Sequence, residues 1–353
     1  MSKIIEILKK NIRASGSISL KEYMSIVLYH PTTGYYSKKN IIGKSGDFIT
    51  APEISQVFGE LIAIWLIYNK KKFFKKFFNY IELGPGKGTL CKDIFRTVKK
   101  LDNDLYKKIK EIYFFEKSYT LKRIQYKNIN PVFISTLDEV ETSPMFVIAN
   151  EFFDAIPVNQ YIKKNNVWYE KRVCITNNKF TFTNSERIKN LNIPFPTNAS
   201  NNCIFEYSEY SHYLILDICN RIRKFGGVFV IIDYAKNNND YSSTLMSIFR
   251  HKYVTPFSFP GETDLSIKPD YNFYKKIAKK QGCKVLGPFS QGYFLKKLGI
   301  EERIKSLIKK NTSQKYDLNL QKERLINKNY MGESFKVMII MNETLTDLIF
   351  ENE

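Results

Sequence analysis

The sequence predicts an α/β fold built on a mostly parallel, doubly wound sheet. Apolar runs of strand length recur along the chain, and helical stretches lie between most of them. A glycine-rich turn, GPGKG at 84–88, directly follows the first of these runs. Strands that alternate with helices pair in parallel, and such sheets bind ligands at their carboxyl edge. The runs are FFNYIEL, EIYFFEK, PVFIS, MFVIANE, GGVFVIIDY, CKVLG and FKVMIIM.

The first 75 residues are expected to form an N-terminal helical region. Apolar residues recur at helical spacing over 4–12, without the continuous apolar stretch of a signal peptide. The loop GKSGDFITAPEIS then leads into an amphipathic helix. Within this loop Thr50 is a candidate helix cap, because Pro52 stands near the helix start and Glu53 follows at the capping-box spacing.

Residues 76–353 are expected to contain the sheet and its ligand site, with two insertions. The region at about 155–205 has alternating strands separated by Asn-rich turns, which predicts a small inserted β structure of hairpins. The region at about 236–275 is rich in Asn, Pro, Ser and aromatic residues. It is expected to be a long loop with little regular structure, and such loops in compact domains are usually functional.

Composition limits the partners and the compartment. The chain carries 55 Lys and Arg against 35 Asp and Glu, a formal net charge of +20, which could serve a nucleic-acid partner. Because the lysines are dispersed, we favour a solvated surface over a nucleic-acid face. The five cysteines form no CxxC pair, so we expect no metal site and a reducing cytoplasm. No apolar run approaches the roughly 20 residues that cross a bilayer, so no membrane insertion is expected.

The glycine-rich turn is typical of a nucleotide-type ligand site. Gly84, Gly86 and Gly88 stand between a strand and a helix, where glycine permits positive φ and close approach of a ligand to the backbone. The dinucleotide fingerprint G-x-G-x-x-G does not fit, because the third glycine comes one residue early. A Walker P-loop is excluded, because Lys87 is followed by glycine instead of Ser or Thr.

A strand that runs into E-x-G-x-G resembles motif I of the Rossmann-like S-adenosylmethionine methyltransferases. The resemblance implies that the three glycines pass beneath S-adenosyl-L-methionine and that Glu82 helps to hold its methionine amino group. The next strand ends in Glu116, about 34 residues later, where an acidic side chain accepts both ribose hydroxyls in that family. Asn150, at the end of MFVIANE, is a further candidate for cofactor binding.

Nine stretches, in order, resemble the MidA family of S-adenosylmethionine-dependent protein arginine methyltransferases, which includes the mitochondrial complex I assembly-factor methyltransferase. Two departures are Lys87, where the family commonly has Arg, and Ala235, where it commonly has Gly. The resemblance implies a class I methyltransferase that modifies an arginine of a protein substrate, a subunit of respiratory complex I, in the cytoplasm of a bacterium or the mitochondrial matrix of a eukaryote. The stretches are LYHPTTGYYSKKNIIGKSGDFITAPEISQVFGELIAIWL, IELGPGKGTLCKDIFR, IANEFFDAIPVNQY, WYEKRV, IIDYAKN, TLMSIFRHKY, PGETDLS, SQGYFLKKLGIEERI and MGESFKVMII.

Arginine methylation requires carboxylates beside the acceptor. A guanidinium stays protonated up to pH values above about 12. Carboxylates must therefore bind it bidentately, localise its charge and let a proton leave during transfer. Glu151 and Asp154 in ANEFFDAIP follow a strand and are therefore candidates at the carboxyl edge of the sheet. The alternative is that Asp154 only caps a helix that begins after it. The family resemblance also implies that the GKSGDFITAPEIS loop closes over cofactor and acceptor, with the carboxylates of Asp47 and Glu53 in or near the pocket.

Three function classes follow from these observations. The first is the protein arginine methyltransferase that the resemblance implies. The second, a nucleic-acid methyltransferase, is motivated by the positive charge, but NEFFD lacks the N/D-P-P-Y/F motif that holds a flipped base. The third is a non-catalytic assembly protein with only a cofactor-like fold, against which the intact E-x-G-x-G motif argues.

Overall fold

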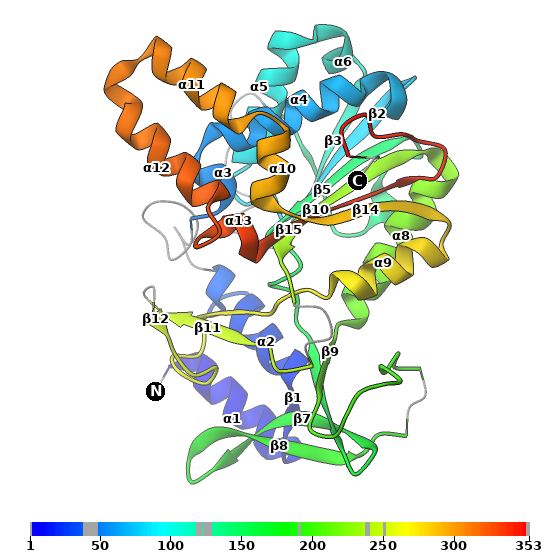
Figure 1. The fold of residues 1–353 in the computed structure, drawn as a ribbon. Helices are drawn as coiled ribbons and strands as arrows, with labels where there is room; N and C mark the ends of the chain where they lie inside the picture. The colour runs from blue at the N-terminus through cyan, green and yellow to red at the C-terminus, as the bar shows by residue number, and fades with distance from the viewer. Residues whose placement is uncertain are drawn as a thin grey trace.

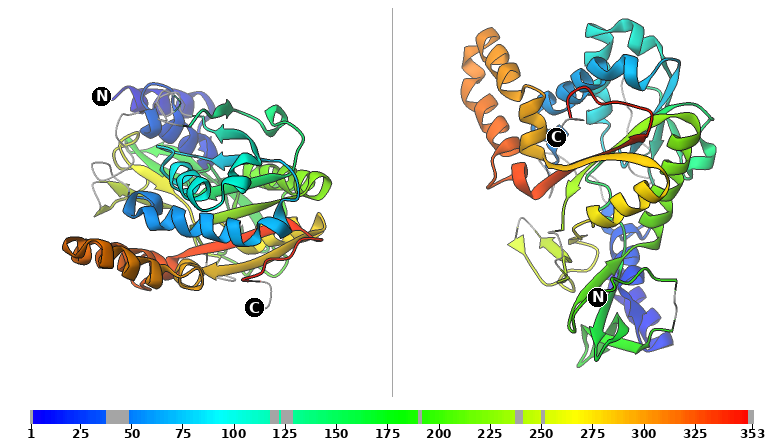
Figure 2. Two further views of the ribbon diagram at one scale, coloured as in Figure 1. Left: turned by 90° about the horizontal axis from the view of Figure 1, so that it is seen from above. Right: turned by 45° about the vertical axis from the view of Figure 1, so that its right-hand side comes forward.

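The chain folds into two lobes. The computed structural model describes residues 2–37, 49–117, 122, 129–189, 192–236, 241–249 and 252–350. Figure 1 shows a sheet lobe, which contains the C-terminus, above an accessory lobe, which contains the N-terminus. The two lobes stay distinct in the rotated right-hand view of Figure 2. Within the described residues no helix is long and apolar enough to cross a membrane.

The sheet lobe is built on a seven-stranded sheet, counted over the described part of the chain. β15 runs antiparallel to both its neighbours, β10 and β14, and the pairs among β10, β5, β2, β3 and β4 are parallel. The predicted α/β fold with a mostly parallel sheet is therefore confirmed. The strands, in order across the sheet, are β14 (Cys283–Ser290), β15 (Phe335–Asn342), β10 (Gly227–Tyr234), β5 (Met145–Asn150), β2 (Phe78–Leu83), β3 (Ile109–Phe115) and β4 (Val132–Ile134).

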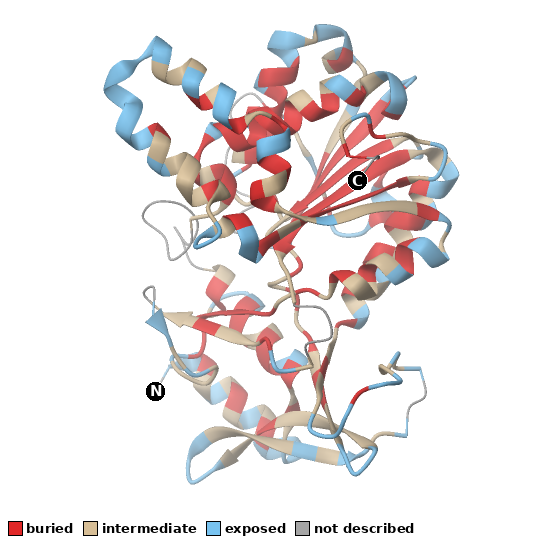
Figure 3. Ribbon diagram, viewed as in Figure 1, coloured by how far each residue is buried: buried red, intermediate tan, exposed pale blue. Residues whose placement is uncertain are grey.

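Helices cover both faces of this sheet. Successive strand residues alternate between two hydrophobic cores: Tyr80 packs with one face and Ile81 with the other. Because the central strands are buried on both sides, they appear in the sequence as continuous apolar runs; Figure 3 shows them almost entirely buried. One face packs on α4 (Gln56–Phe73), α5 (Thr89–Leu101), α10 (Gln291–Lys297), α11 (Ile300–Lys310) and α12 (Lys315–Ile326), and the other on α8 (Glu209–Phe225) and α9 (Tyr271–Lys280). Short helices α6 (Asn103–Lys107) and α13 (Met331–Ser334) complete the lobe.

The accessory lobe combines the N-terminus with the first insertion. Its core contains Leu8 and Met24 from the helices and Val173 from the insertion. The expected N-terminal region of 75 residues thus contributes to both lobes, because α4 packs on the large sheet instead. Asn165 and Asn178 have φ values of 48° and 64°, so the Asn-rich turns close the predicted hairpins in the left-handed region. The elements are α1 (Lys3–Ser15), α2 (Leu20–Tyr29), β1 (Ile18–Ser19), β6 (Asn159–Lys164), β7 (Val167–Thr176), β8 (Lys179–Arg187) and β9 (Ile204–Tyr207).

The second insertion has more regular structure than its composition predicts. Instead of a loop, residues in 236–275 form a small antiparallel sheet in the order β12-β11-β13. Its strands are β11 (Met246–Phe249), β12 (Lys252–Tyr253) and β13 (Asp264–Ser266), and α9 starts at Tyr271. Strands of two to four residues are too short to produce a periodic sequence signal.

Candidate functional site

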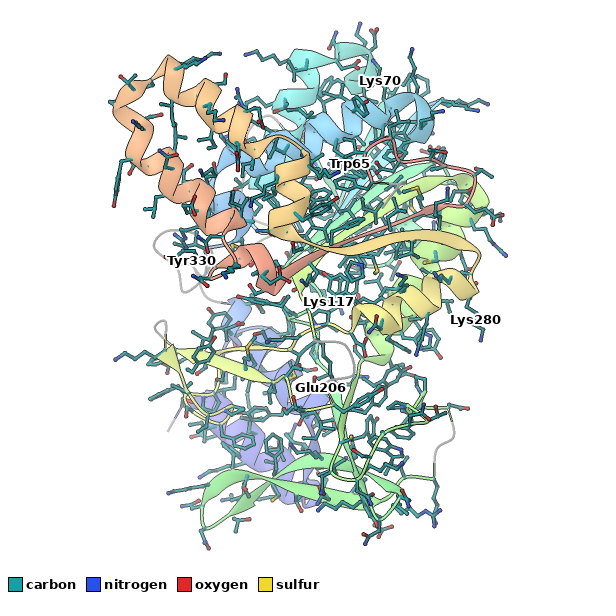
Figure 4. The ribbon with its side chains drawn as sticks, viewed as in Figure 1. Trp65, Lys70, Lys117, Glu206, Lys280 and Tyr330 are labelled. Carbon is teal, nitrogen blue, oxygen red and sulfur yellow. The ribbon has the colours of Figure 1, made fainter. Side chains whose placement is uncertain are left out.

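A cavity of about 470 Å³ lies between the two lobes. The sheet lobe contributes Gly84, Gly86 and Glu116 to its lining, whereas the accessory lobe contributes Tyr36 and Asp264. Lys117, which also lines the cavity, is labelled at the junction of the lobes in Figure 4. The parallel register aligns the carboxyl ends of β2, β3, β5 and β10 at this junction, so side chains that follow these strands meet there.

The glycine turn forms one wall of the cavity. Gly84, Gly86 and Gly88 have φ values of 66°, 56° and 70°, which only glycine adopts at little cost. A Cβ atom on Gly84 would lie 2.9 Å from Cδ2 of Phe152, so the turn passes directly against that ring. Gly84 and Gly86 line the cavity, whereas Gly88 stands outside the lining as the N-cap of α5.

Glu82, in β2, comes two residues before Gly84 and is not among the residues that line the cavity. The Tyr80 hydroxyl donates a hydrogen bond to its Oε2 at 2.7 Å, on the face of β2 that packs against α5. Burial raises the pKa of Glu82 to about 8, against the lowering effect of the Tyr80 and Cys91 hydrogen bonds. Its carboxyl group is thus held by Tyr80 of β2 and by the Cys91 backbone at the start of α5, and contact with a cofactor amino group stays a prediction.

Glu116 and Asn150 follow neighbouring strands at the carboxyl edge. Glu116 comes directly after β3, is 9% exposed and lines the cavity. Asn150 ends β5, and its Nδ2 donates to Oε1 of Glu151 at 3.2 Å. Its Oδ1 is buried and has no hydrogen-bond partner among the described residues, but Asn150 is not among the residues that line the cavity, so its part in cofactor binding stays a prediction.

Glu151 occupies a strained backbone position at the cavity wall. Its φ is 52°, in the left-handed region that non-glycine residues rarely adopt. Its Oε1 accepts the Ala51 N–H at 3.1 Å, at the start of α3 (Ala51–Ile54). The Thr50 side chain makes no cap hydrogen bond, so the capping box predicted from the sequence is wrong. Burial, with the charge of Asp154, raises the pKa of Glu151 to about 8.

Asp154 lines the cavity, and burial raises its pKa to about 7. No helix begins directly after Asp154; an irregular segment leads from Ala155 into β6. The helix-capping alternative for Asp154 is therefore wrong. The Ile267 N–H donates to the Asp154 carbonyl at 3.0 Å, which ties this segment to the accessory lobe.

Asp233 holds the backbone of the 152–154 loop and was not anticipated from the sequence. It is fully buried, and its Oδ2 accepts the N–H groups of Phe152, Phe153 and Asp154 at 3.2, 2.9 and 3.2 Å. Its Oδ1 accepts the Tyr234 N–H at 2.8 Å. Burial and the neighbouring carboxylates raise its pKa, whereas these N–H donors oppose that shift. The signal in the sequence was a carboxylate near the end of the buried strand GGVFVIIDY.

Glu53, one of the two carboxylates expected from the 43–55 loop, does not line the cavity. Glu53 accepts a hydrogen bond from the Thr89 hydroxyl, and its Oε2 lies 3.9 Å from the Lys87 ammonium. It therefore ties α3 to the glycine turn and the start of α5. Asp47 lies outside the described residues.

The accessory lobe adds aromatic and acidic groups that sequence reasoning missed. The rings of Tyr29, at the end of α2, and Tyr36, in η1 (Tyr35–Ser37), stack with centroids 5.2 Å apart. Tyr29 donates its hydroxyl proton to the Ala155 carbonyl at 2.9 Å, and Tyr36 donates to Oδ1 of Asp264 at 3.4 Å. Tyr29, Tyr36 and Asp264 all line the cavity. Tyr36 and Asp264 were hard to find because the elements that contain them, η1 and β13, are only three residues long.

These features fit S-adenosyl-L-methionine. A turn of positive-φ glycines offers a wall without side chains, and Glu116 offers an acceptor for hydroxyl groups. The described residues contain no group of three or more His, Cys, Asp or Glu side chains that could hold a metal ion.

Comparison with known proteins agrees with this geometry. Residues 61–289 match the protein family described as "Putative S-adenosyl-L-methionine-dependent methyltransferase". The mitochondrial protein arginine methyltransferase NDUFAF7 of Danio rerio is 31% identical, over 96% of this chain and 87% of its own. The human protein of that name is 30% identical, over 94% of this chain and 81% of its own. A crystal structure of a Burkholderia thailandensis protein bound to S-adenosyl-homocysteine is similar with a TM-score of 0.80, at 22% identity, covering 97% of this chain and 92% of that one.

Proposed function

Because this chain belongs to the family of S-adenosyl-L-methionine-dependent methyltransferases that it matches, we propose that it methylates arginine nitrogens of a protein substrate. The family membership supplies the cofactor and the reaction class. The finer statement concerns the acceptor, and its support comes from the chemistry of the cavity together with the similarity to the arginine methyltransferases.

The sign of the charge in the cavity carries the proposal. The chain as a whole has a formal net charge of +20, yet among the described residues that line the cavity carboxylates outnumber ammonium groups. The carboxylates are Glu116, Glu151, Asp154 and Asp264, and the ammonium groups are Lys21 and Lys117. Such a lining attracts a cationic acceptor and repels the phosphates of a nucleic acid. It thereby favours the arginine reading over the nucleic-acid alternative.

The residues divide the work between the two ends of the cavity. The cofactor, when bound, supplies a methyl group activated by a sulfonium charge. Gly84 and Gly86 would lie against it, and Glu116 would accept hydrogen bonds from its ribose hydroxyls. At the other end we assign Glu151 and Asp154 to the guanidinium, where they localise its charge and orient one nitrogen for transfer.

The raised pKa values suit these carboxylates to moving a proton. Asp154 and Glu151 have pKa values of about 7 and 8, close to neutral pH, where a general base works best. A bound guanidinium favours their ionised forms, and one of them then accepts the proton that the nitrogen loses during transfer. Phe152, packed against Gly84, covers the cavity wall with an apolar ring and helps to exclude water.

The acceptor protein follows only from the family resemblance, which implies a subunit of respiratory complex I. All five cysteines are free thiols, which fits a reducing compartment such as the cytoplasm. A complex I subunit would meet the enzyme in the cytoplasm of a bacterium or in the mitochondrial matrix.

Methyl transfer in vitro tests the proposal. Purified protein is incubated with S-adenosyl-L-methionine labelled on its methyl group and with extract from cells that lack the gene. Acid hydrolysis and amino-acid analysis should recover the label as methylarginine, and an Asp154→Asn control should give far less. Label recovered in RNA or DNA would support the nucleic-acid alternative, and cofactor binding without any transfer would support the assembly-protein alternative.

A further inference from the structure

The small sheet of the accessory lobe turns one face toward the cavity. Because side chains alternate along a strand, β13 directs Asp264 and Ser266 into the cavity and Leu265 into the accessory core. Ile267, the next residue, is likewise buried in that core. Asp264 is only 6% exposed although it lines the cavity.

The neighbours of Asp264 across the small sheet are apolar. β11 pairs with β13 so that Ile248 lies beside Asp264 and Met246 beside Ser266, and all four residues line the cavity. A carboxylate at such a place costs free energy unless donors or a cation compensate its charge. The Tyr36 hydroxyl is one donor to Oδ1 of Asp264, at 3.4 Å.

Backbone and tyrosine contacts hold Asp264 and Asp154 near one another. The Ile267 N–H, just after β13, donates to the Asp154 carbonyl at 3.0 Å. Tyr29 is tied to Ala155, Tyr36 is tied to Asp264, and the two rings stack on each other. The negative charges of Asp154 and Asp264 both add to the effect of burial in raising the pKa of Tyr29, which places both carboxylates around this pair of rings.

We propose that Asp264 is a specificity-determining residue, which binds the acceptor guanidinium together with Asp154. This inference rests on the proposed function and adds to Glu151 and Asp154, which belong to the sheet lobe, a carboxylate from the accessory lobe. A guanidinium presents five N–H donors in a planar fork, so two carboxylates from different lobes can each engage one side of it. A lysine ammonium presents its three donors at a single point and gains less from the second carboxylate. The stacked tyrosines add aromatic surface for the planar cation.

Binding of a matched pair of probes tests the assignment. Protein saturated with S-adenosyl-homocysteine is titrated calorimetrically with N-acetyl-arginine methylamide and, separately, with N-acetyl-lysine methylamide. Wild-type protein should bind the arginine probe more tightly. Asp264→Asn should weaken that binding by about 10- to 100-fold, as expected for the loss of charge-assisted hydrogen bonds, while the affinity for S-adenosyl-homocysteine stays unchanged. Asp264→Glu should keep more of the arginine affinity than Asp264→Asn, because it keeps the charge.

The control is Asp270→Asn, the same exchange six residues along the chain. Asp270 caps α9 through a bond from the Phe273 N–H, and Asn caps helices equally well, so this variant should bind both probes as wild type does. An arginine affinity that is unchanged in Asp264→Asn, or no arginine preference in the wild type, would overturn the inference. Failure of the proposed function would be seen in a different experiment, because wild-type protein would then form no methylarginine in cell extract.

Discussion

The contact between the glycine turn and Phe152 allows the cofactor wall to be tested with a single methyl group. In Gly84→Ala the new Cβ atom would lie 2.9 Å from Phe152 Cδ2, closer than carbon atoms approach in folded proteins. The ring cannot easily withdraw, because it packs edge-to-face on Phe153 and Phe115, with centroids 5.2 and 6.2 Å away. The substitution must therefore shift the turn or push the ring toward the cavity.

Two costs add up at this position. A non-glycine residue at the φ of 66° found at Gly84 costs about 1–2 kcal/mol. Overpacking against the ring costs about 1–3 kcal/mol more. Gly16 separates the two, because it has a φ of 75° and a Cβ atom there would meet nothing within 4 Å. Gly16→Ala should therefore lose only the backbone part, and Gly84→Ala should lose about 2–5 kcal/mol in total.

Denaturant unfolding and calorimetric titration with S-adenosyl-homocysteine measure both effects. We expect Gly84→Ala to be less stable than Gly16→Ala and to bind S-adenosyl-homocysteine at least about tenfold more weakly, whereas Gly16→Ala binds it normally. Adding Phe152→Leu to Gly84→Ala should recover part of the stability, because the two sites are in contact. Equal stability losses and equal cofactor affinities in the two alanine variants would show that the contact with Phe152 has no such effect.

Three further predictions concern the carboxylates. Asp154→Asn should lower kcat/KM by about 10²- to 10³-fold through the loss of charged hydrogen bonds, without lowering Tm, because an amide has no charge to bury; a lowered Tm with full activity would argue for a structural role. Asp233→Ala should leave the N–H groups of the 152–154 loop without their acceptor and lower the free energy of unfolding, measured by denaturant titration, by about 3–5 kcal/mol. It should also reduce kcat more than cofactor affinity, and an unchanged kcat would contradict the positioning role of Asp233. The pKa values of Asp154 and Glu151, raised to about 7 and 8, predict that kcat/KM rises from pH 6 to 9 as both ionise. The folded state holds these protons after the unfolded chain has lost them, so Tm should fall as the pH rises from about 4, where the unfolded carboxyl groups titrate, to about 8; a flat pH profile of both quantities would be inconsistent with these shifts.

The sequence predicted the sheet lobe well because its signals are local and strong. Each central strand is a continuous apolar run, and the glycine turn follows its strand directly in the chain. The same reasoning found Glu116 and Asp154, because each residue follows a strand whose carboxyl end must lie at the ligand edge. The Asn-rich turns predicted the hairpins of the accessory lobe for a comparable local reason.

The parts that sequence reasoning missed depend on contacts between distant segments. The Thr50 capping box looked correct by spacing, but Glu151, 100 residues away from Ala51, accepts the first N–H of that helix instead. Glu53 likewise bonds to Thr89 instead of lining the cavity. Asp264 lies on a strand too short to show a period, and its place in the cavity depends on how the second insertion docks on α2 and η1.

Methylarginine formation in cells is the most direct measurement of the central claim, that this cavity methylates arginine in a protein. Proteins are compared by mass spectrometry among cells with the gene, cells without it, and cells complemented with wild type or with Asp154→Asn at equal protein levels. We expect at least one methylarginine that disappears with the gene, returns with the wild type and does not return with Asp154→Asn. Identical methylarginine sites in all four samples, or full recovery with Asp154→Asn, would contradict it.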